Sequence, residues 1–94
     1  MNIRWTRRAL DDVGRIGDFI AAYDPRRADA VERQLIEAPK SLLEFPRRGS
    51  PLTEFRPRDV REFRIGDYLL RYELTASDIY VLRFFHARED RFSR

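Results

Sequence analysis

The single histidine, His86, is the side chain best suited to proton transfer at neutral pH. A metal-free ribonuclease needs a base for the 2′-hydroxyl, an acid for the leaving oxygen and cations for the phosphate. The sequence offers these types in a set of four: His86, Glu62, Arg61 and Arg88. Because arginine is abundant in this chain and a lone histidine at a strand end is often structural, both a catalytic and a structural role stay open for His86.

Several other chemistries lack the residues they require. The absence of cysteine excludes a disulfide, a thiolate metal site and a thiol nucleophile. One histidine and no close-spaced carboxylate cluster predict no metal site, and the sequence has neither a phosphate-cradling glycine loop nor a serine hydrolase motif. We therefore expect no metal and no cofactor.

The apolar runs are only a few residues long, which is too short to span a bilayer. Arg4, Arg7 and Arg8 interrupt the N-terminal stretch in which a secretory signal needs an apolar segment. These observations predict a cytoplasmic protein with no membrane contact.

The charged residues are biased toward arginine. The chain has 19 basic and 16 acidic residues, for a net charge of +3, and Lys40 is its only lysine. A GC-rich genome favours arginine codons without functional meaning, whereas an acidic partner or nucleic acid would use the planar arginine fork. The net charge is too small to decide between these causes.

The N-terminal half predicts a strand followed by a helical hairpin. A short strand over Asn2 to Trp5 precedes Thr6, which can cap a helix. Helical spacing then relates Leu10, Val13, Ile16, Ile20 and Tyr23. The pair Asp24-Pro25 restarts the chain as a second helix, whose apolar face holds Ala28, Val31, Leu35, Ala38 and Leu42. Pro39 predicts a kink or break, with Ser41 to Phe45 as the last turn.

The C-terminal half predicts a loop and three strands. The loop runs from Pro46 to Pro57, and the strands cover Val60 to Ile65, Tyr68 to Leu74 and Ile79 to His86. Gly66-Asp67 is a two-residue hairpin turn, and Thr75 to Asp78 is a looser one. The order β-α-α-β-β-β predicts a single α+β domain over residues 1–94, with an antiparallel helical hairpin on one face of an antiparallel sheet.

Alternation along the hairpin separates an apolar face from a charged one. The two-residue turn sets Ile65 opposite Tyr68 and places the apolar residues of both strands under the helices. The other face should be open, and it holds Val60, Glu62, Arg64, Leu69, Arg71 and Glu73. The third strand has two plausible cores, because a bulge in the second turn would reverse its parity. We favour Leu82 and Phe84 inward and Arg83 outward, which would bring Arg83 beside Arg64 and Arg71.

The open face has two readings. It is either a solvated surface with cross-strand ion pairs or a basic groove that receives RNA, DNA or an acidic peptide. Glu62 and Glu73 argue against simple phosphate binding, because they partly neutralise the surface.

The whole chain resembles the ParE/RelE toxin superfamily, the toxins of type II toxin–antitoxin and plasmid stabilisation systems. The resemblance rests on the opening Ile3-Arg4-Trp5-Thr6 with Ala9, Leu10 and Asp12, on Asp24-Pro25, and on Leu43, Phe45-Pro46 and Gly49. It continues through Val60-Arg61-Glu62, Tyr68 and Tyr72, and Val81-Leu82-Arg83 with His86, Arg88 and Asp90. It implies the fold described above and a cognate antitoxin, ParD-like or similar, in a hetero-oligomer with the toxin.

Within this superfamily, RelE-like toxins cleave mRNA on the ribosome, whereas ParE-like toxins poison DNA gyrase. The RelE-like pattern has an arginine directly after the tyrosine of the second hairpin strand, where this chain has Leu69. The lysine-rich stretch of RelE-like toxins is also missing, so the resemblance favours the ParE-like branch. His86 keeps the ribonuclease alternative open. The residues expected to bind antitoxin or target are Arg61, Arg64, Leu69, Arg71, Arg83, Arg88 and Arg91.

Overall fold

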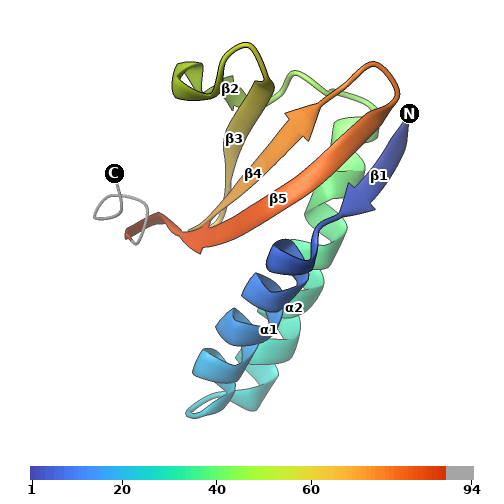
Figure 1. The fold of residues 1–94 in the computed structure, drawn as a ribbon. Coiled ribbons are helices and arrows are strands. Elements are labelled where there is room, and N and C mark those ends of the chain that lie inside the picture. The colour runs from blue at the N-terminus through green and yellow to red at the C-terminus, as the bar shows by residue number, and fades with distance from the viewer. Residues whose placement is uncertain (89–94) are drawn as a thin grey trace.

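A computed structural model of the chain describes residues 1–88, which form a helical hairpin on one face of a five-stranded sheet (Figure 1). The elements are β1 (Asn2–Trp5), α1 (Arg7–Ala21), α2 (Pro25–Glu37), the 3-10 helix η1 (Ala38–Leu43), β2 (Ser50–Pro51), the 3-10 helix η2 (Thr53–Phe55), β3 (Asp59–Ile65), β4 (Tyr68–Leu74) and β5 (Asp78–His86). The strand order is β1-β5-β4-β3-β2, and β1 runs parallel to β5 whereas the other neighbours are antiparallel. The predicted α+β class is confirmed.

The helices begin where local capping signals place them. The Thr6 hydroxyl accepts a hydrogen bond from the Ala9 amide at 3.1 Å, and the Asp24 carboxylate accepts one from the Arg27 amide at 3.1 Å. Pro25 opens α2 because its missing N–H would have no helical partner at that position. The helix gives way to η1 at Ala38, one residue before Pro39, as the predicted break requires.

The segment predicted as an irregular loop is partly regular. Its residues Ser50 and Pro51 form β2, which pairs with Glu62 and Arg61 of β3, and Thr53–Phe55 form η2. A two-residue strand and a single 3-10 turn leave no periodicity in a sequence, so local patterns could not predict either element.

The core lies between the helical hairpin and the inward face of the sheet. The predicted register of β3 and β4 is confirmed. Ile65 pairs with Tyr68, Phe63 with Leu70 and Arg61 with Tyr72. Gly66 has a φ of 58°, which its missing Cβ permits in this tight turn. The inward residues of β4 pack with apolar residues of both helices, and this buried set includes Tyr68, Leu70, Tyr72, Val13, Ile16, Val31 and Leu35.

Strand β5 contains a β-bulge, but it lies within the strand and not in the second turn. Arg71 pairs with Arg83 while the next residue, Tyr72, pairs with Val81, so Leu82 is an extra residue in the ladder. Val81 is therefore in the core before the bulge, and Phe84 is in the core after it. The predictions for Phe84 and for Arg83 beside Arg71 are confirmed. The inward assignment of Leu82 is wrong, since this half-buried residue lies outside the core cluster.

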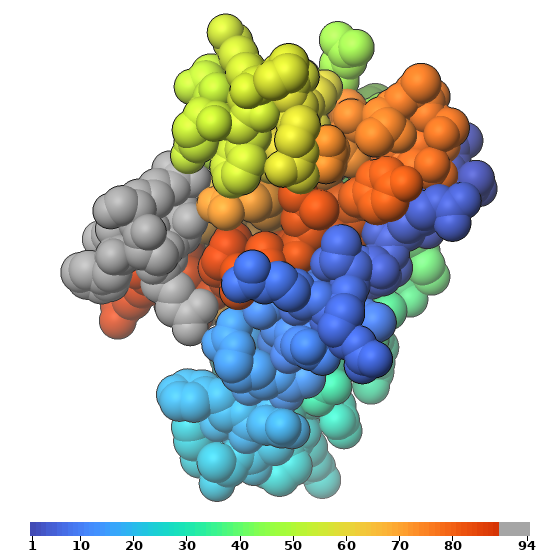
Figure 2. Space-filling model, in the orientation of Figure 1, coloured from blue at the N-terminus to red at the C-terminus, as the bar shows by residue number. Residues whose placement is uncertain are grey.

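The outward face is less open than the sequence predicted. Val60 is fully buried, and the paired Glu62 and Arg71 are largely covered. Part of the cover comes from η2, because the Phe55 ring centroid lies 5.4 Å from the Arg71 guanidinium carbon. Figure 2 shows the surface of β4 and β5 recessed between the segment around η2 and the beginning of α1. The outward face is therefore a groove with walls and not a flat sheet surface.

In the part of the chain that the structure describes, no helix combines the length and apolar character needed to cross a bilayer.

Candidate functional site

We call the recess on the outward face of β3, β4 and β5 the outward groove; its floor includes Glu62, Leu69, Arg71, Arg83 and Phe85. This floor carries a cross-strand ion pair. Both the Nε and Nη2 atoms of Arg71 donate to one oxygen of Glu62, at 3.0 and 2.9 Å. Towards the end of the same strands, the Arg58 guanidinium contacts Glu73 at 2.7 and 3.1 Å. These pairs match the cross-strand ion pairing that was one of the two readings of this face. They also neutralise charge that a phosphate would otherwise meet.

Arg71 and Arg83 lie against the same aromatic ring. Their guanidinium carbons are 4.8 and 4.7 Å from the centroid of Phe85, within the range of cation–π attraction. With the Phe55 contact of Arg71, aromatic and guanidinium groups alternate across the groove. Each of the two cations also has a carboxylate partner, Glu62 for Arg71 and Asp12 for Arg83. The groove therefore presents charges whose positions are fixed before any partner binds.

Asp12 is the buried carboxylate that positions Arg83. Its Oδ2 accepts from the Arg83 Nε at 2.8 Å and from the Phe84 amide at 2.9 Å, and its Oδ1 accepts from Arg83 and Arg15. The Phe84 amide lies beyond the last residue of β1 that pairs with β5, so Asp12 takes the place of a strand partner there. One side chain of α1 thus closes the sheet edge and orients a groove arginine.

Arg61 is on the opposite side of β3 from Glu62 and holds the preceding loop. Its Nε donates to Asp59 at 2.9 Å and its Nη1 to the Gly49 carbonyl at 2.9 Å. The neighbouring Tyr72 hydroxyl donates to the Pro46 carbonyl at 2.7 Å and accepts from the Gly49 amide at 2.8 Å. Burial raises the pKa of the Tyr72 phenol. The guanidinium of Arg61 is therefore committed to the loop.

His86 lies at the far end of the sheet. It pairs with Tyr68, and the two rings meet edge to face with centroids 5.4 Å apart. Its Nδ1 accepts a hydrogen bond from the Arg88 amide at 3.2 Å. The Nδ1 atom of His86 is therefore engaged by the backbone that follows β5.

Of the four candidate catalytic residues, only His86 and Arg88 are brought together, and both line one polar hollow. Arg61 is opposite Tyr72, and His86 is opposite Tyr68. These two β4 residues are four positions apart, which separates their backbones by roughly 13 Å at the usual rise of a strand. Glu62 is on the outward face and bound to Arg71. Arg88 is exposed beyond the end of β5.

The expected binding residues fall into three groups. Leu69, Arg71 and Arg83 lie on the outward face, and the exposed Arg64 belongs to the same face, with its Nε donating to the Gly66 carbonyl at 2.8 Å. Arg61 and Arg88 lie elsewhere, and Arg91 is outside the described residues. Sequence reasoning did not identify Phe55 and Phe85, because their role depends on a loop and a bulge that leave no local signal.

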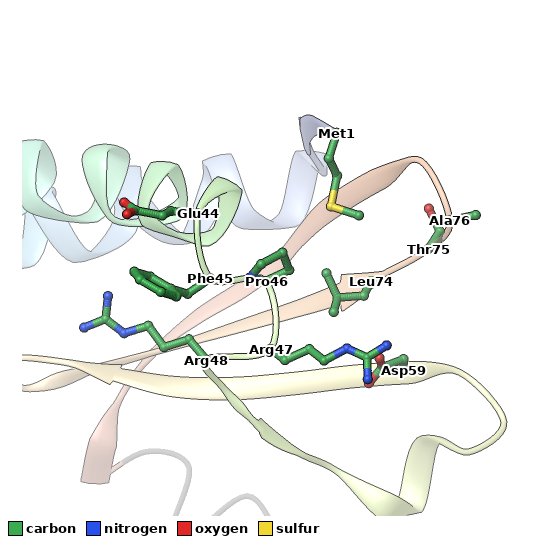
Figure 3. A pocket seen from close by; sticks show the side chains of 10 residues that line it. All are labelled: Met1, Glu44, Phe45, Pro46, Arg47, Arg48, Asp59, Leu74, Thr75 and Ala76. Atoms are coloured by element: carbon green, nitrogen blue, oxygen red, sulfur yellow. The ribbon is translucent and has the colours of Figure 1, made fainter.

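A separate apolar cavity of about 1080 Å³ opens at the other end of β4 (Figure 3). Met1 and Leu74 approach it from opposite sides, and Phe45, whose surface is 58% exposed, lies beside it. Within residues 1–88, no three histidine or acidic side chains gather in a group that could hold a metal ion.

Comparison with known proteins gave consistent matches. Residues 3–91 match the family described as ParE toxin of type II toxin-antitoxin system, parDE. The chain is 33% identical to Toxin RelE2 of Caulobacter vibrioides, covering 88% of this chain and 91% of that protein. It is 34% identical to Putative toxin Y4kP of Sinorhizobium fredii, covering 93% and 88%. A solved structure titled "Chromosomal ParDE TA system from P. aeruginosa" has the same fold, with a TM-score of 0.77 at 22% identity over 92% of this chain and 95% of that chain.

Proposed function

The chain belongs to the ParE toxin family of type II toxin–antitoxin systems, and we propose that it arrests growth by binding DNA gyrase without cleaving RNA. In this proposal a cognate antitoxin of the ParD kind forms a hetero-oligomer with the toxin and neutralises it. Binding, and not covalent chemistry, is the activity of the toxin.

The observation that supports this proposal is the dispersal of the residues suited to phosphodiester cleavage. General acid–base catalysis requires acid and base within hydrogen-bond reach of one reacting group. Here the Glu62 carboxylate is paired in the outward groove, whereas Arg61 faces the other side of the sheet. His86 is at the distant end, with Nδ1 accepting a hydrogen bond. These three side chains do not surround a common substrate position.

The proposed target surface is the outward groove. Leu69 and Phe85 are opposite one another on its floor, and Arg71 and Arg83 are fixed there by Glu62 and Asp12. Cations held in place before binding lose less side-chain entropy on association, and their positions select partners with matching carboxylates. Arg64, at the exposed end of the groove, adds a charge at the rim.

Induced expression with two readouts tests the proposal. Purified toxin should inhibit supercoiling by gyrase, and induced cells should keep intact mRNA. Arg64→Ala should weaken gyrase inhibition, whereas Arg33→Ala, which removes an exposed arginine from α2, should not. Unimpaired supercoiling at toxin concentrations that arrest growth would overturn the proposal.

A ribosome-dependent mRNA interferase is the second candidate. It is favoured by a polar hollow of about 510 Å³ that is lined by His86, Arg64 and Arg88, residue types that can contact RNA. On this alternative, translation stops within minutes and mRNA is cut only when ribosomes are present. Cleavage should then be abolished by His86→Ala or Arg64→Ala in variants whose thermal unfolding shows that they still fold.

A further inference from the structure

The helical hairpin extends past the edge of the sheet, so its far end lacks a sheet surface beneath it (Figure 1). Two large aromatic residues of α1 and the turn that follows are exposed there, Phe19 at 70% and Tyr23 at 68%. Their rings meet edge to face with centroids 5.8 Å apart. Two adjoining aromatic side chains left in water mark a surface that a partner covers.

These two rings form one wall of a hollow of about 500 Å³ between the end of the hairpin and the β3–β4 turn. Ile16 and Ile20 of α1 line its apolar base, and Tyr68 joins them from β4. A hollow of this size accepts one or two large side chains of a partner. We call this site the hairpin-end hollow.

Positive charge surrounds the hairpin-end hollow. Arg15 and Arg27 line it, and it shares Asp67 and His86 with the polar hollow that also contains Arg64 and Arg88. Among residues 1–88, the two hollows together are lined by four arginines (15, 27, 64 and 88) and by one carboxylate, that of Asp67. A partner that fits both must combine an apolar anchor with neighbouring negative charge.

We propose that the hairpin-end hollow receives an acidic, amphipathic segment of the cognate antitoxin, which inserts an aromatic or leucine side chain between Phe19, Tyr23 and Tyr68. Carboxylates that flank this anchor contact Arg27 and the arginines of the polar hollow. This inference rests on the antitoxin pairing proposed above and assigns it a site at the end of the hairpin, which shares only Arg64 with the rim of the outward groove.

The contacts at this site favour a protein segment over RNA. Phe19 and Tyr23 meet edge to face, which does not offer the parallel platform on which bases stack. The apolar base formed by Ile16 and Ile20 suits an apolar side chain of a protein and offers a phosphate no partner. An antitoxin covers its toxin during normal growth, so a lasting partner of this kind can shield the exposed aromatics from water.

The test measures affinity between purified toxin and purified cognate antitoxin. Phe19→Ser combined with Tyr23→Ser should weaken binding by at least about 30-fold, as expected for buried aromatic anchors. Phe45→Ser is the matched control, because it removes an exposed phenylalanine beside the other cavity and should change affinity by less than about threefold. Arg27→Glu should also weaken binding to the antitoxin, and this loss of affinity should be larger at low salt than at high salt.

Because Phe19 and Tyr23 are exposed, thermal unfolding of the double variant should match that of the parent within a few degrees. Unchanged antitoxin affinity in a folded double variant would overturn the inference. So would a variant that binds antitoxin normally but no longer inhibits growth, or one that loses affinity only for a single-stranded RNA oligonucleotide. Loss of antitoxin affinity in a toxin that does not inhibit gyrase would support the inference while refuting the gyrase proposal.

Discussion

Replacing Asp12 by alanine removes the carboxylate that joins α1 to β5 and to the outward groove. The side chain of Asp12 is 7% exposed, and that of its partner Arg83 is 24% exposed. Alanine would leave the Phe84 amide buried without its acceptor and would release the Arg83 guanidinium from its two hydrogen bonds. The variant therefore tests stability and groove geometry together.

The expected loss of stability follows from these contacts. A buried amide left without an acceptor costs about 1–3 kcal/mol, and removing one partner of a buried ion pair costs about 3–5 kcal/mol. Arg83 is partly exposed and can rehydrate, so we expect the lower end, about 3 kcal/mol in total. For a domain of this size, that loss lowers the midpoint of thermal unfolding by roughly 12–24 °C.

Thermal and urea unfolding measures the effect in four variants: Asp12→Ala, Asp12→Asn, Arg83→Met and the double variant Asp12→Ala with Arg83→Met. Asp12→Asn keeps an acceptor for the Phe84 amide and should lose only about half as much stability as Asp12→Ala. In a cycle with Arg83→Met, the two substitutions should be less than additive, because each removes the same ion pair. A decrease below roughly 4 °C for Asp12→Ala, or full additivity in the cycle, would refute the reasoning.

Four further outcomes are expected. Gly49→Ala should destabilise the fold by about 1–3 kcal/mol in urea unfolding, because its Cβ would come within 2.8 Å of the Tyr72 hydroxyl. Gly14→Ala, whose Cβ would meet open space on α1, should instead stabilise it by about 0.5–1 kcal/mol, and the same sign for both would contradict this account. Although burial opposes it, hydrogen bonds from Ser77 and Arg4 lower the pKa of Asp78, so stability should fall as pH drops below about 4, and Asp78→Asn should flatten that decline in acid unfolding curves. Burial raises the pKa of Tyr72, so stability should fall as pH rises above about 10, and an equally steep alkaline loss in Tyr72→Phe would show that another group is responsible.

Local signals were sufficient to predict most of the elements. Thr6, Asp24-Pro25 and Gly66-Asp67 each act through neighbours in the sequence, so the helix starts and the β3–β4 register could be predicted without tertiary information. The inward face of β4 followed from simple alternation once this turn was placed.

The features that were missed depend on contacts between distant segments. Both sets of alternate residues in β5 are largely apolar, so only packing against β1 and α1 could place the bulge at Leu82. Arg61 and Arg71 are the same residue type on adjacent strands. One binds a loop and the other an ion-pair partner, and only the folded loop distinguishes them. Asp12 was recognised as part of a family pattern, but its role as an acceptor for Phe84 required the position of the β5 edge.

The bulge at Leu82 makes this residue the spare position of β5. Without Leu82, Val81 would be followed directly by Arg83, and the alternation of Val81 inward, Arg83 outward and Phe84 inward would pair regularly with Tyr72, Arg71 and Leu70. Both halves of the strand would keep their faces. In protein engineering and in natural variation, this position should therefore tolerate many amino acids and also the loss of one residue, whereas a one-residue deletion in the unbulged β4 would exchange the faces of one half of that strand.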